Sequence, residues 1–190
     1  MQKEDLRVKR TRKLLSESLI DLLSKKDFSK INVNDICENA MIHRATFYNH
    51  FYDKEDLLNY TLDEIQEDLF EKSIENTVFN NSKEMYISLM STIFDFLIEN
   101  KVKIISIIRN NSEKLTTTLV NTIKKSINYL ISKNKFKEQY TLPIEVIVNF
   151  YTGGFSMLGL DWIEHTDKYS KEDLLNFCNI LFNEEGIVKK

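Results

Sequence analysis

The chain has 190 residues, of which 42% are hydrophobic and 29% are charged, and its formal net charge is −3. This composition is typical of a globular protein of one or two domains and excludes a disordered chain. Four glycines and one proline are too few for the turns of a β-sandwich, a dinucleotide-binding fold or a phosphate-binding loop, so we expect an all-α fold.

The N-terminal segment is basic and leads into a long amphipathic helix. Residues 1–13 carry six basic and two acidic side chains, and no apolar run follows, so we expect no signal peptide there. Leu15, Leu19 and Leu22 lie at i, i+4 and i+7. This spacing predicts one apolar face on a helix over residues 4–26.

Two short helices are predicted next. Asn32 and Asp35 have the spacing of a capping box, which predicts a helix over residues 33–39. Residues 40–42 form a tight connector, and the second short helix is predicted over residues 43–50. Asp53 is expected to cap a longer fourth helix.

Asparagine pairs and capping residues mark the later helix boundaries, because Asn tolerates left-handed backbone and caps helices. The later helices are predicted to begin near residues 82, 104, 112, 143 and 171, with a polar linker over residues 133–139. The total is about nine helices. We expect a three-helix DNA-binding domain over residues 1–52 and a helical effector-binding and dimerisation domain over residues 53–190.

Two short helices joined by about three residues, after a basic amphipathic helix, predict a helix-turn-helix, whose second helix enters the major groove of DNA. Phe47 and Phe51 lie at i and i+4 and are expected to anchor that helix from behind. Arg44 can donate two hydrogen bonds to a guanine, and Lys54 suits a phosphate. The candidate DNA-contacting residues are Asn34, His43, Arg44, Ala45, Thr46, Tyr48, Asn49, His50 and Lys54.

Residues 12–58 resemble the DNA-binding domain of the TetR family of bacterial transcription regulators. The resemblance rests on T-R-K-L-L at 11–15, I-N-V-N-D-I-C-E-N-A at 31–40 and R-A-T-F-Y-N-H-F-Y-D-K-E-D-L-L at 44–58. The segment G-G-F-S-M-L-G-L-D-W-I-E-H at 153–165 resembles one branch of the family, which includes regulators of dihydroxyacetone-kinase operons, some of them activators.

The chain departs from the family pattern at Met41, at His43 and at Cys37, which stands where alanine is common and is expected only to pack. Met41 stands in the turn where the family usually has glycine, so either the left-handed backbone is avoided or some strain is accepted. His43 stands where serine or threonine usually caps the recognition helix, and it is a poorer cap.

The resemblance implies a homodimer on a near-palindromic double-stranded DNA operator. Its last two helices would pair with those of a second copy, and the Gly153–Gly154 pair indicates either that close approach or a helix kink. The candidate dimer-interface residues are Gly153, Gly154, Leu158, Trp162, Leu174, Cys178 and Leu181.

The resemblance also implies an effector pocket among the central helices, for an unknown small molecule or protein. An aromatic and methionine stripe at helical spacing is equally typical of an ordinary core. The candidate pocket residues are Tyr86, Met90, Phe94, Leu97, Ile105, Leu119, Ile123, Tyr151 and Phe155.

No pattern in the sequence indicates catalysis, a metal site or a cofactor, because the three histidines have no partners at ligand or catalytic spacing. The 15 uncharged residues between Glu145 and Asp161 are fewer than the roughly 20 that span a bilayer. Together with two cysteines that fall in apolar patterns, this indicates a cytoplasmic bacterial protein with no membrane partner. The sequence therefore predicts a homodimeric repressor released by an effector. The alternatives are an activator that works through a coactivator protein and a helical protein-interaction adaptor.

Overall fold

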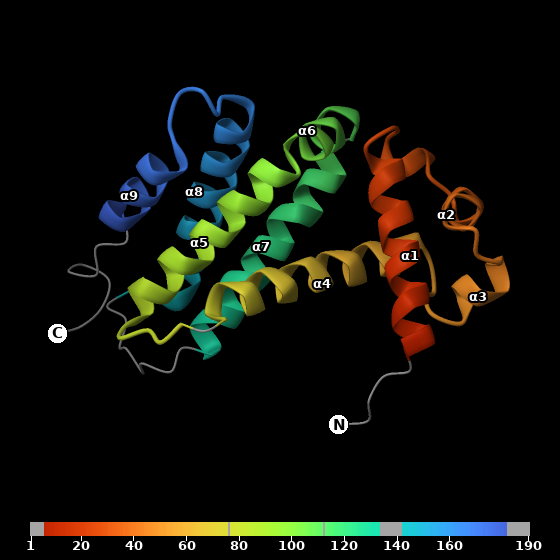
Figure 1. Cartoon of the computed structure of the whole chain (residues 1–190), viewed down its shortest axis with the longest axis horizontal. Helices are drawn as coiled ribbons and strands as arrows, with labels where there is room; N and C mark the ends of the chain where they lie inside the picture. Colours follow the sequence, from red (N-terminus) through yellow and green to blue (C-terminus); the bar gives the residue numbers. More distant parts are fainter. Residues whose placement is uncertain (1–5, 76, 112, 134–141, 182–190) are drawn as a thin grey trace. The chain divides into compact units, whose positions relative to one another are not determined.

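The computed structural model describes residues 6–75, 77–111, 113–133 and 142–181, and these ranges are helical and contain no strand (Figure 1). The all-α expectation and the predicted helix count are confirmed. The elements are α1 (Leu6–Leu23), the 3-10 turn η1 (Phe28–Lys30), α2 (Val33–Ala40), α3 (Arg44–Tyr48), α4 (Lys54–Ile74), α5 (Ser82–Glu99), α6 (Lys101–Asn110), α7 (Glu113–Lys133), α8 (Ile144–Glu164) and α9 (Lys171–Leu181).

The capping signals read from the sequence are present. The Asn32 side chain accepts from the Asp35 N–H, and the Asp35 carboxylate accepts from the Asn32 N–H, both at 3.0 Å. Asn81 accepts from the Glu84 N–H at 2.9 Å. Helix α3 is shorter than the predicted 43–50, because His43 and Asn49 are its caps and the helix proper runs from Arg44 to Tyr48.

The described part of the chain divides into two compact units. Residues 1–64 and 102–116 form the first unit, and residues 65–101 and 117–190 form the second, so α4 contributes to both. The functional division expected at residue 52 stays a prediction.

The core of the first unit lies among α1, α2, α3 and the start of α4. Leu15, Leu19, Ile36, Phe47 and Leu57 are each fully buried. These residues come from α1, α2, α3 and α4, and in α1 the buried Leu15 and Leu19 lie on the apolar face that the helical periodicity predicted.

The core of the second unit joins α5, α8 and α9. Phe94 and Trp162 pack edge to face with ring centroids 5.2 Å apart, and Leu174 and Cys178 are fully buried in the same cluster. The sequence assigned Trp162, Leu174 and Cys178 to a dimer interface. In the structure these side chains fill the core of their own chain, and the dimer interface itself stays a prediction. Leu158 packs against this cluster as well.

Most of the predicted effector-pocket residues also belong to this core, and so they pack on one another. The six of them in the cluster are Tyr86, Met90, Phe94, Leu97, Tyr151 and Phe155. Leu119 and Ile123 are half-buried on α7, and Ile105 lies on α6 in the first unit. A groove of about 560 Å³ in the second unit lies between Thr77–Ser88 and Asn179, and none of the nine predicted residues lines it.

Candidate nucleic-acid interface

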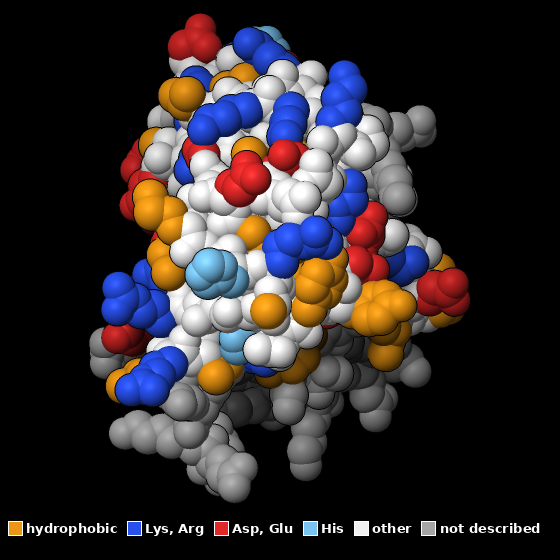
Figure 2. Space-filling model, turned by 90° about the vertical axis from the view of Figure 1, so that its right-hand side faces the viewer, with side chains coloured by type: hydrophobic (Ala, Val, Ile, Leu, Met, Phe, Trp, Pro, Cys, Tyr) orange, Lys and Arg blue, Asp and Glu red, His pale blue; other side chains and the backbone are white. Residues whose placement is uncertain are grey.

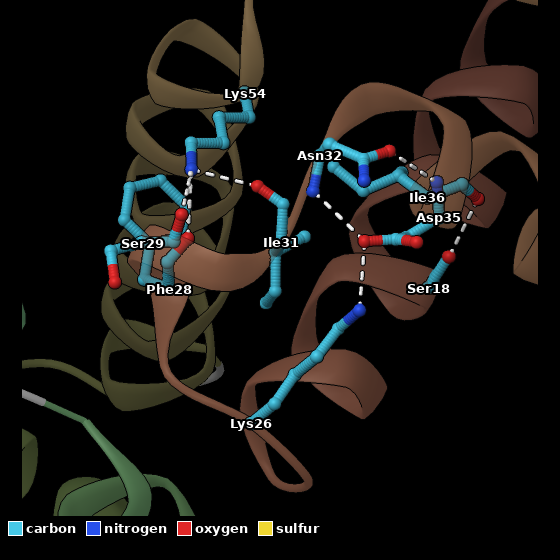
Figure 3. A network of polar contacts seen from close by, with 9 residues as sticks. All are labelled: Ser18, Lys26, Phe28, Ser29, Ile31, Asn32, Asp35, Ile36 and Lys54. Carbon is cyan, nitrogen blue, oxygen red and sulfur yellow. Dashed lines mark hydrogen bonds and ion pairs between the residues drawn. The ribbon is translucent and has the colours of Figure 1, made fainter.

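Helix α2 begins at a polar junction that ties it to the end of α1. Lys26 Nζ lies 2.7 Å from Asp35 Oδ2, and the same carboxylate completes the capping box with Asn32 (Figure 3). The hydrogen bond from Lys26 and that from the Asn32 N–H lower the pKa of Asp35. Ser18 Oγ, buried on α1, donates to the Ile36 carbonyl at 2.8 Å. These contacts fix the start of α2 against α1.

The turn between α2 and α3 has a left-handed backbone at Met41, so of the two possibilities stated for this residue the strained one occurs. Met41 has φ 55° and ψ 40°, the left-handed conformation that favours glycine, and its side chain is 94% exposed. The Met41 and Ile42 N–H groups donate to the carbonyls of Glu38 and Cys37, which ends α2.

The start of α3 has no side-chain cap. His43 is extended, with φ −68° and ψ 142°, and its side chain makes no capping hydrogen bond. Its carbonyl accepts from the Thr46 and Phe47 N–H groups. The His43 ring is exposed and so remains available to a ligand.

Two phenylalanines anchor α3 from behind, as the sequence predicted. Phe47 is fully buried and Phe51 is 4% exposed, with ring centroids 5.9 Å apart. Phe51 continues onto Tyr60 at 5.2 Å, and the Arg12 guanidinium lies 5.3 Å from the Tyr60 ring. Because α3 has only five residues, these buried rings set which of its faces points to solvent.

The outward face of α3 carries the predicted base-reading residues. Arg44 Nη2 donates to the Tyr48 hydroxyl at 3.4 Å, and the guanidinium lies 5.8 Å from the Tyr48 ring. Tyr48 is 50% exposed. The predicted residues that are exposed are Asn34, His43, Arg44, Ala45, Tyr48 and Asn49, and the half-buried ones are Thr46, His50 and Lys54. Figure 2 shows Lys, Arg and His side chains spread over the face on which α2 and α3 lie in Figure 1.

Lys54 differs from the other predicted DNA contacts. Its Nζ donates to the carbonyls of Phe28 at 2.8 Å and Ile31 at 2.7 Å, with the Ser29 carbonyl at 3.5 Å (Figure 3). The same ammonium lies 4.5 Å from the centroid of the Phe28 ring. The sequence had assigned this group to a phosphate; its partners in the structure are backbone carbonyls.

Asn110 and Asn111 form one of the asparagine pairs that mark helix boundaries in the sequence, and sequence reasoning missed their further role in the structure. Asn111 Oδ1 accepts from the Phe28 N–H at 2.7 Å, and Asn111 Nδ2 donates to the Leu23 carbonyl at 2.9 Å. Asn110 Nδ2 donates to the Ser24 carbonyl at 2.6 Å. No sequence signal could reveal these contacts, because the partners are more than 80 positions apart.

The described side chains include no group of three His, Cys, Asp or Glu residues that could hold a metal ion. No helix in the described ranges is long and apolar enough to cross a membrane. Cys37 and Cys178 are buried free thiols; burial raises the pKa of each, to about 11 for Cys178.

Two family models match the chain. A model described as bacterial regulatory proteins of the tetR family matches residues 17–61, which include α2 and α3. A model described as a transcriptional regulator C-terminal region, TetR_C_8, matches residues 86–184. Together they cover most of both units.

Two curated relatives match shorter segments. An uncharacterized HTH-type transcriptional regulator, YxbF of Bacillus subtilis strain 168, is 46% identical over 55 residues, 28% of this chain and 14% of the relative. The HTH-type dhaKLM operon transcriptional activator DhaS of Lactococcus lactis subsp. lactis IL1403 is 32% identical over 72 residues, 38% of this chain and 34% of the relative. The matched segments thus span about a seventh and a third of these relatives.

The fold is shared over nearly the whole chain with a solved structure. The crystal structure of a TetR transcriptional regulator from Streptococcus agalactiae 2603V superposes with a TM-score of 0.63. The alignment covers 94% of this chain and 96% of that chain at 20% identity, so the likeness concerns the fold alone.

Proposed function

Because this chain belongs to the TetR family of bacterial transcriptional regulators, we propose that it acts in the cytoplasm as a homodimer on a near-palindromic operator. Each α3 helix would enter the major groove of one half-site. The observation that carries this proposal is the orientation of α3. Its buried Phe47 faces the core and leaves Arg44, Ala45 and Tyr48 on the outward face.

The outward face divides into base-reading and phosphate-binding groups. Arg44 has the forked guanidinium that matches the two acceptors of a guanine, and the Ala45 methyl suits a thymine methyl. Tyr48 and His50 suit phosphates, which fix the register of the protein on the duplex. The contact between Arg44 and Tyr48 supports this division, since it holds the guanidinium beside the helix before DNA arrives.

An exposed apolar face on α8 and α9 supports the homodimer. On α8, Phe150 and Met157 are 72% and 68% exposed, and they flank Gly153–Gly154. A Cβ added at either glycine would meet no described atom within 4 Å, so a second helix can approach there. The exposed apolar residues of α9 are Phe177, Ile180 and Leu181. This face keeps Gly153, Gly154 and Leu181 of the predicted interface, whereas Trp162, Leu174 and Cys178 are buried within their own chain.

We place the effector in the second unit, on the buried side of α8. The Thr152 and Ser156 hydroxyls lie one helical turn apart, are 4% and 8% exposed, and find no hydrogen-bond partner among the described atoms. A buried hydroxyl without a partner is unfavourable, which supports a ligand with polar groups. An effector that binds better to a dimer whose two α3 helices no longer match the half-site spacing would favour that state and so release the operator. A protein that works in this way is a repressor.

A second candidate function is activation. The 32% identity with DhaS, whose name is that of a transcriptional activator, favours it. A promoter fusion in a strain that lacks the gene separates the two: loss of a repressor raises expression, and loss of an activator lowers it.

The first test is selection of bound sequences from a random duplex pool at moderate and raised salt, with the oligomeric state measured by light scattering. A two-fold symmetric motif that survives raised salt, bound by a dimer, supports the proposal. Enrichment of nothing, with weak salt-sensitive binding alone, contradicts it and favours the adaptor alternative.

The matched variants are Arg44→Ala and Arg44→Lys, assayed on the selected operator and on single-base variants of it. Both should relax base preference at one position of each half-site, because Lys keeps the charge but not the fork. If Arg44→Ala weakened binding but retained full base preference, the contact would be to a phosphate.

A further inference from the structure

The η1 turn between α1 and α2 is held through its backbone by two side chains from distant segments. The Phe28 carbonyl accepts from Lys54 at the start of α4, and the Phe28 N–H donates to Asn111 just after α6. All of these residues belong to the first unit. Both the N–H and the carbonyl of Phe28 are therefore hydrogen-bonded to side chains from distant segments.

The Lys54 ammonium has three protons to donate, and three backbone carbonyls lie within hydrogen-bond distance of it. It lies within hydrogen-bond distance of the Phe28, Ser29 and Ile31 carbonyls, as Figure 3 shows for the contacts that converge on its nitrogen. The Phe28 ring covers it as well. A phosphate could recruit this ammonium only by breaking contacts that hold the turn.

The side-chain amide of Asn111 also has protein partners for both its oxygen and its nitrogen. Its oxygen accepts from the Phe28 N–H, and its nitrogen donates to the carbonyls of Leu23, at the end of α1, and Ile107, on α6. The amide thus joins the end of α1, the η1 turn and α6. The amide carries no net charge and its donors already bind the Leu23 and Ile107 carbonyls, so Asn111 is not placed to contact a phosphate.

The position of this turn sets the position of α2. Ile31, whose carbonyl Lys54 binds, directly precedes the Asn32 cap of α2, and α2 leads through three residues into α3. A five-residue helix has little packing surface of its own, so its placement depends on the segments that hold it.

We propose that Lys54 and Asn111 are positioning residues: they hold the η1 turn from two sides and so place α2 and α3 for specific DNA contact, without touching the DNA themselves. This inference rests on the proposed function for its DNA-binding consequence. It also changes the role that the sequence indicated for Lys54. Lys54 no longer contacts a phosphate but, with Asn111, forms hydrogen bonds to the backbone of the η1 turn, and we call these hydrogen bonds the brace.

The test compares Lys54→Met, Lys54→Arg and Asn111→Ala on the operator selected with the wild-type protein. Met keeps most of the length of the Lys54 side chain and removes its donors, whereas Arg can still donate to carbonyls. Lys30→Met is the matched control, because Lys30 is an exposed lysine of the same turn. Each protein is titrated over a range of salt concentrations against operator and non-specific duplex.

We expect Lys54→Met and Asn111→Ala each to weaken operator binding about fivefold or more, the low end of what one base contact contributes. The salt dependence of affinity should stay at the wild-type slope, and non-specific binding should be unchanged. Lys54→Arg should restore operator binding. The double variant should lose less than the product of the two single losses, because both act on one turn.

A readout without DNA separates this inference from the proposed function. Amide hydrogen exchange over residues 28–41 should speed up in Lys54→Met and Asn111→Ala and stay as in the wild type in Lys30→Met, with the second unit unaffected. Exchange that speeds up equally in both units would indicate general destabilisation and would overturn the positioning role.

Two further outcomes would also overturn it. A fall in the salt slope by about one in Lys54→Met, with normal binding by Asn111→Ala, would identify Lys54 as a phosphate contact. Unchanged exchange at residues 28–41 in Lys54→Met would show that the turn does not depend on the brace. If the wild-type protein selects no operator, the proposed function fails, and the exchange measurement still decides whether the brace holds the turn.

Discussion

The two units of the chain hold their helices in different ways. In the first unit, α2 and α3 have eight and five residues. Ser18 donates to a backbone carbonyl of α2, and Lys54 and Asn111 donate to carbonyls of the η1 turn and of the end of α1, which lead into α2. In the second unit, α5 and α8 have 18 and 21 residues and pack through the apolar cluster around Phe94 and Trp162.

The difference follows from helix length. A helix of eight residues or fewer is marginal alone and offers few side chains for burial, so contacts to its backbone must supply its position. A long helix buries an apolar stripe over several turns and needs fewer such contacts. We therefore expect changes in the first unit to alter the position of α3, the proposed DNA-reading helix, and changes in the second unit to alter stability and the proposed dimerisation.

The largest expected effects come from removing one buried ring in each unit. Phe47→Ala and Phe94→Ala should each lower the free energy of unfolding by about 3–5 kcal/mol, because both rings are buried. At a temperature where both proteins stay folded, Phe47→Ala should abolish operator binding and Phe94→Ala should retain it. Urea denaturation and band-shift titration measure the two quantities. Equal loss of DNA binding would contradict a separation of the two units.

The buried thiol of the second unit should make stability depend on alkaline pH. Burial raises the pKa of Cys178 to about 11 from its usual 9.0, so the thiol stays neutral in the folded chain while the unfolded chain ionises. This contribution is complete below pH 9 and is lost as the pH rises toward 11, by roughly 1–3 kcal/mol. Urea denaturation of wild type and Cys178→Ala at pH 8 and pH 10.5 isolates it. A loss of the same size in Cys178→Ala would assign the effect to other groups.

Relieving the strained turn of the first unit should stabilise it modestly. Met41→Gly should raise the free energy of unfolding by up to about 1 kcal/mol, because glycine adopts the left-handed backbone without steric cost but loses more entropy on folding. Met41→Ala is the control, since it shortens the exposed side chain and keeps the Cβ. Equal stabilisation by both variants in thermal denaturation would mean that the side chain, and not the backbone, carries the cost.

The smallest expected effect compares two lysine–aspartate pairs at the end of α1. Lys26→Met should cost less than about 1 kcal/mol, because its contact with Asp35 is partly screened by solvent, yet it should speed amide exchange at the start of α2. Lys25→Met removes a contact of similar length with Asp21 in the preceding turn. It should leave exchange in α2 unchanged. Faster exchange in both variants would mean that loss of positive charge alone loosens α2.

Local sequence signals predicted the elements of both units well. The Asn32 and Asn81 side chains accept from N–H groups three residues away, so both partners lie within one short stretch of the sequence. Phe47 and Phe51 were recognised as anchors for the same reason, since their i, i+4 spacing defines a face within one short segment. The sequence does not predict the left-handed backbone at Met41, because a methionine, unlike a glycine, gives no sign of a positive φ.

Local sequence patterns therefore specify the helices, their caps and the face of α3 that is buried, because each depends on residues within about one helical turn. Which apolar face of α8 and α9 fills the core depends on how the helices pack, since both helices carry apolar residues on more than one side. The tertiary structure also decides the partners of Lys54 and Asn111, which lie 26 and 83 positions from Phe28. Contacts over such separations depend on how the helices pack, and periodicity within one helix does not encode that packing.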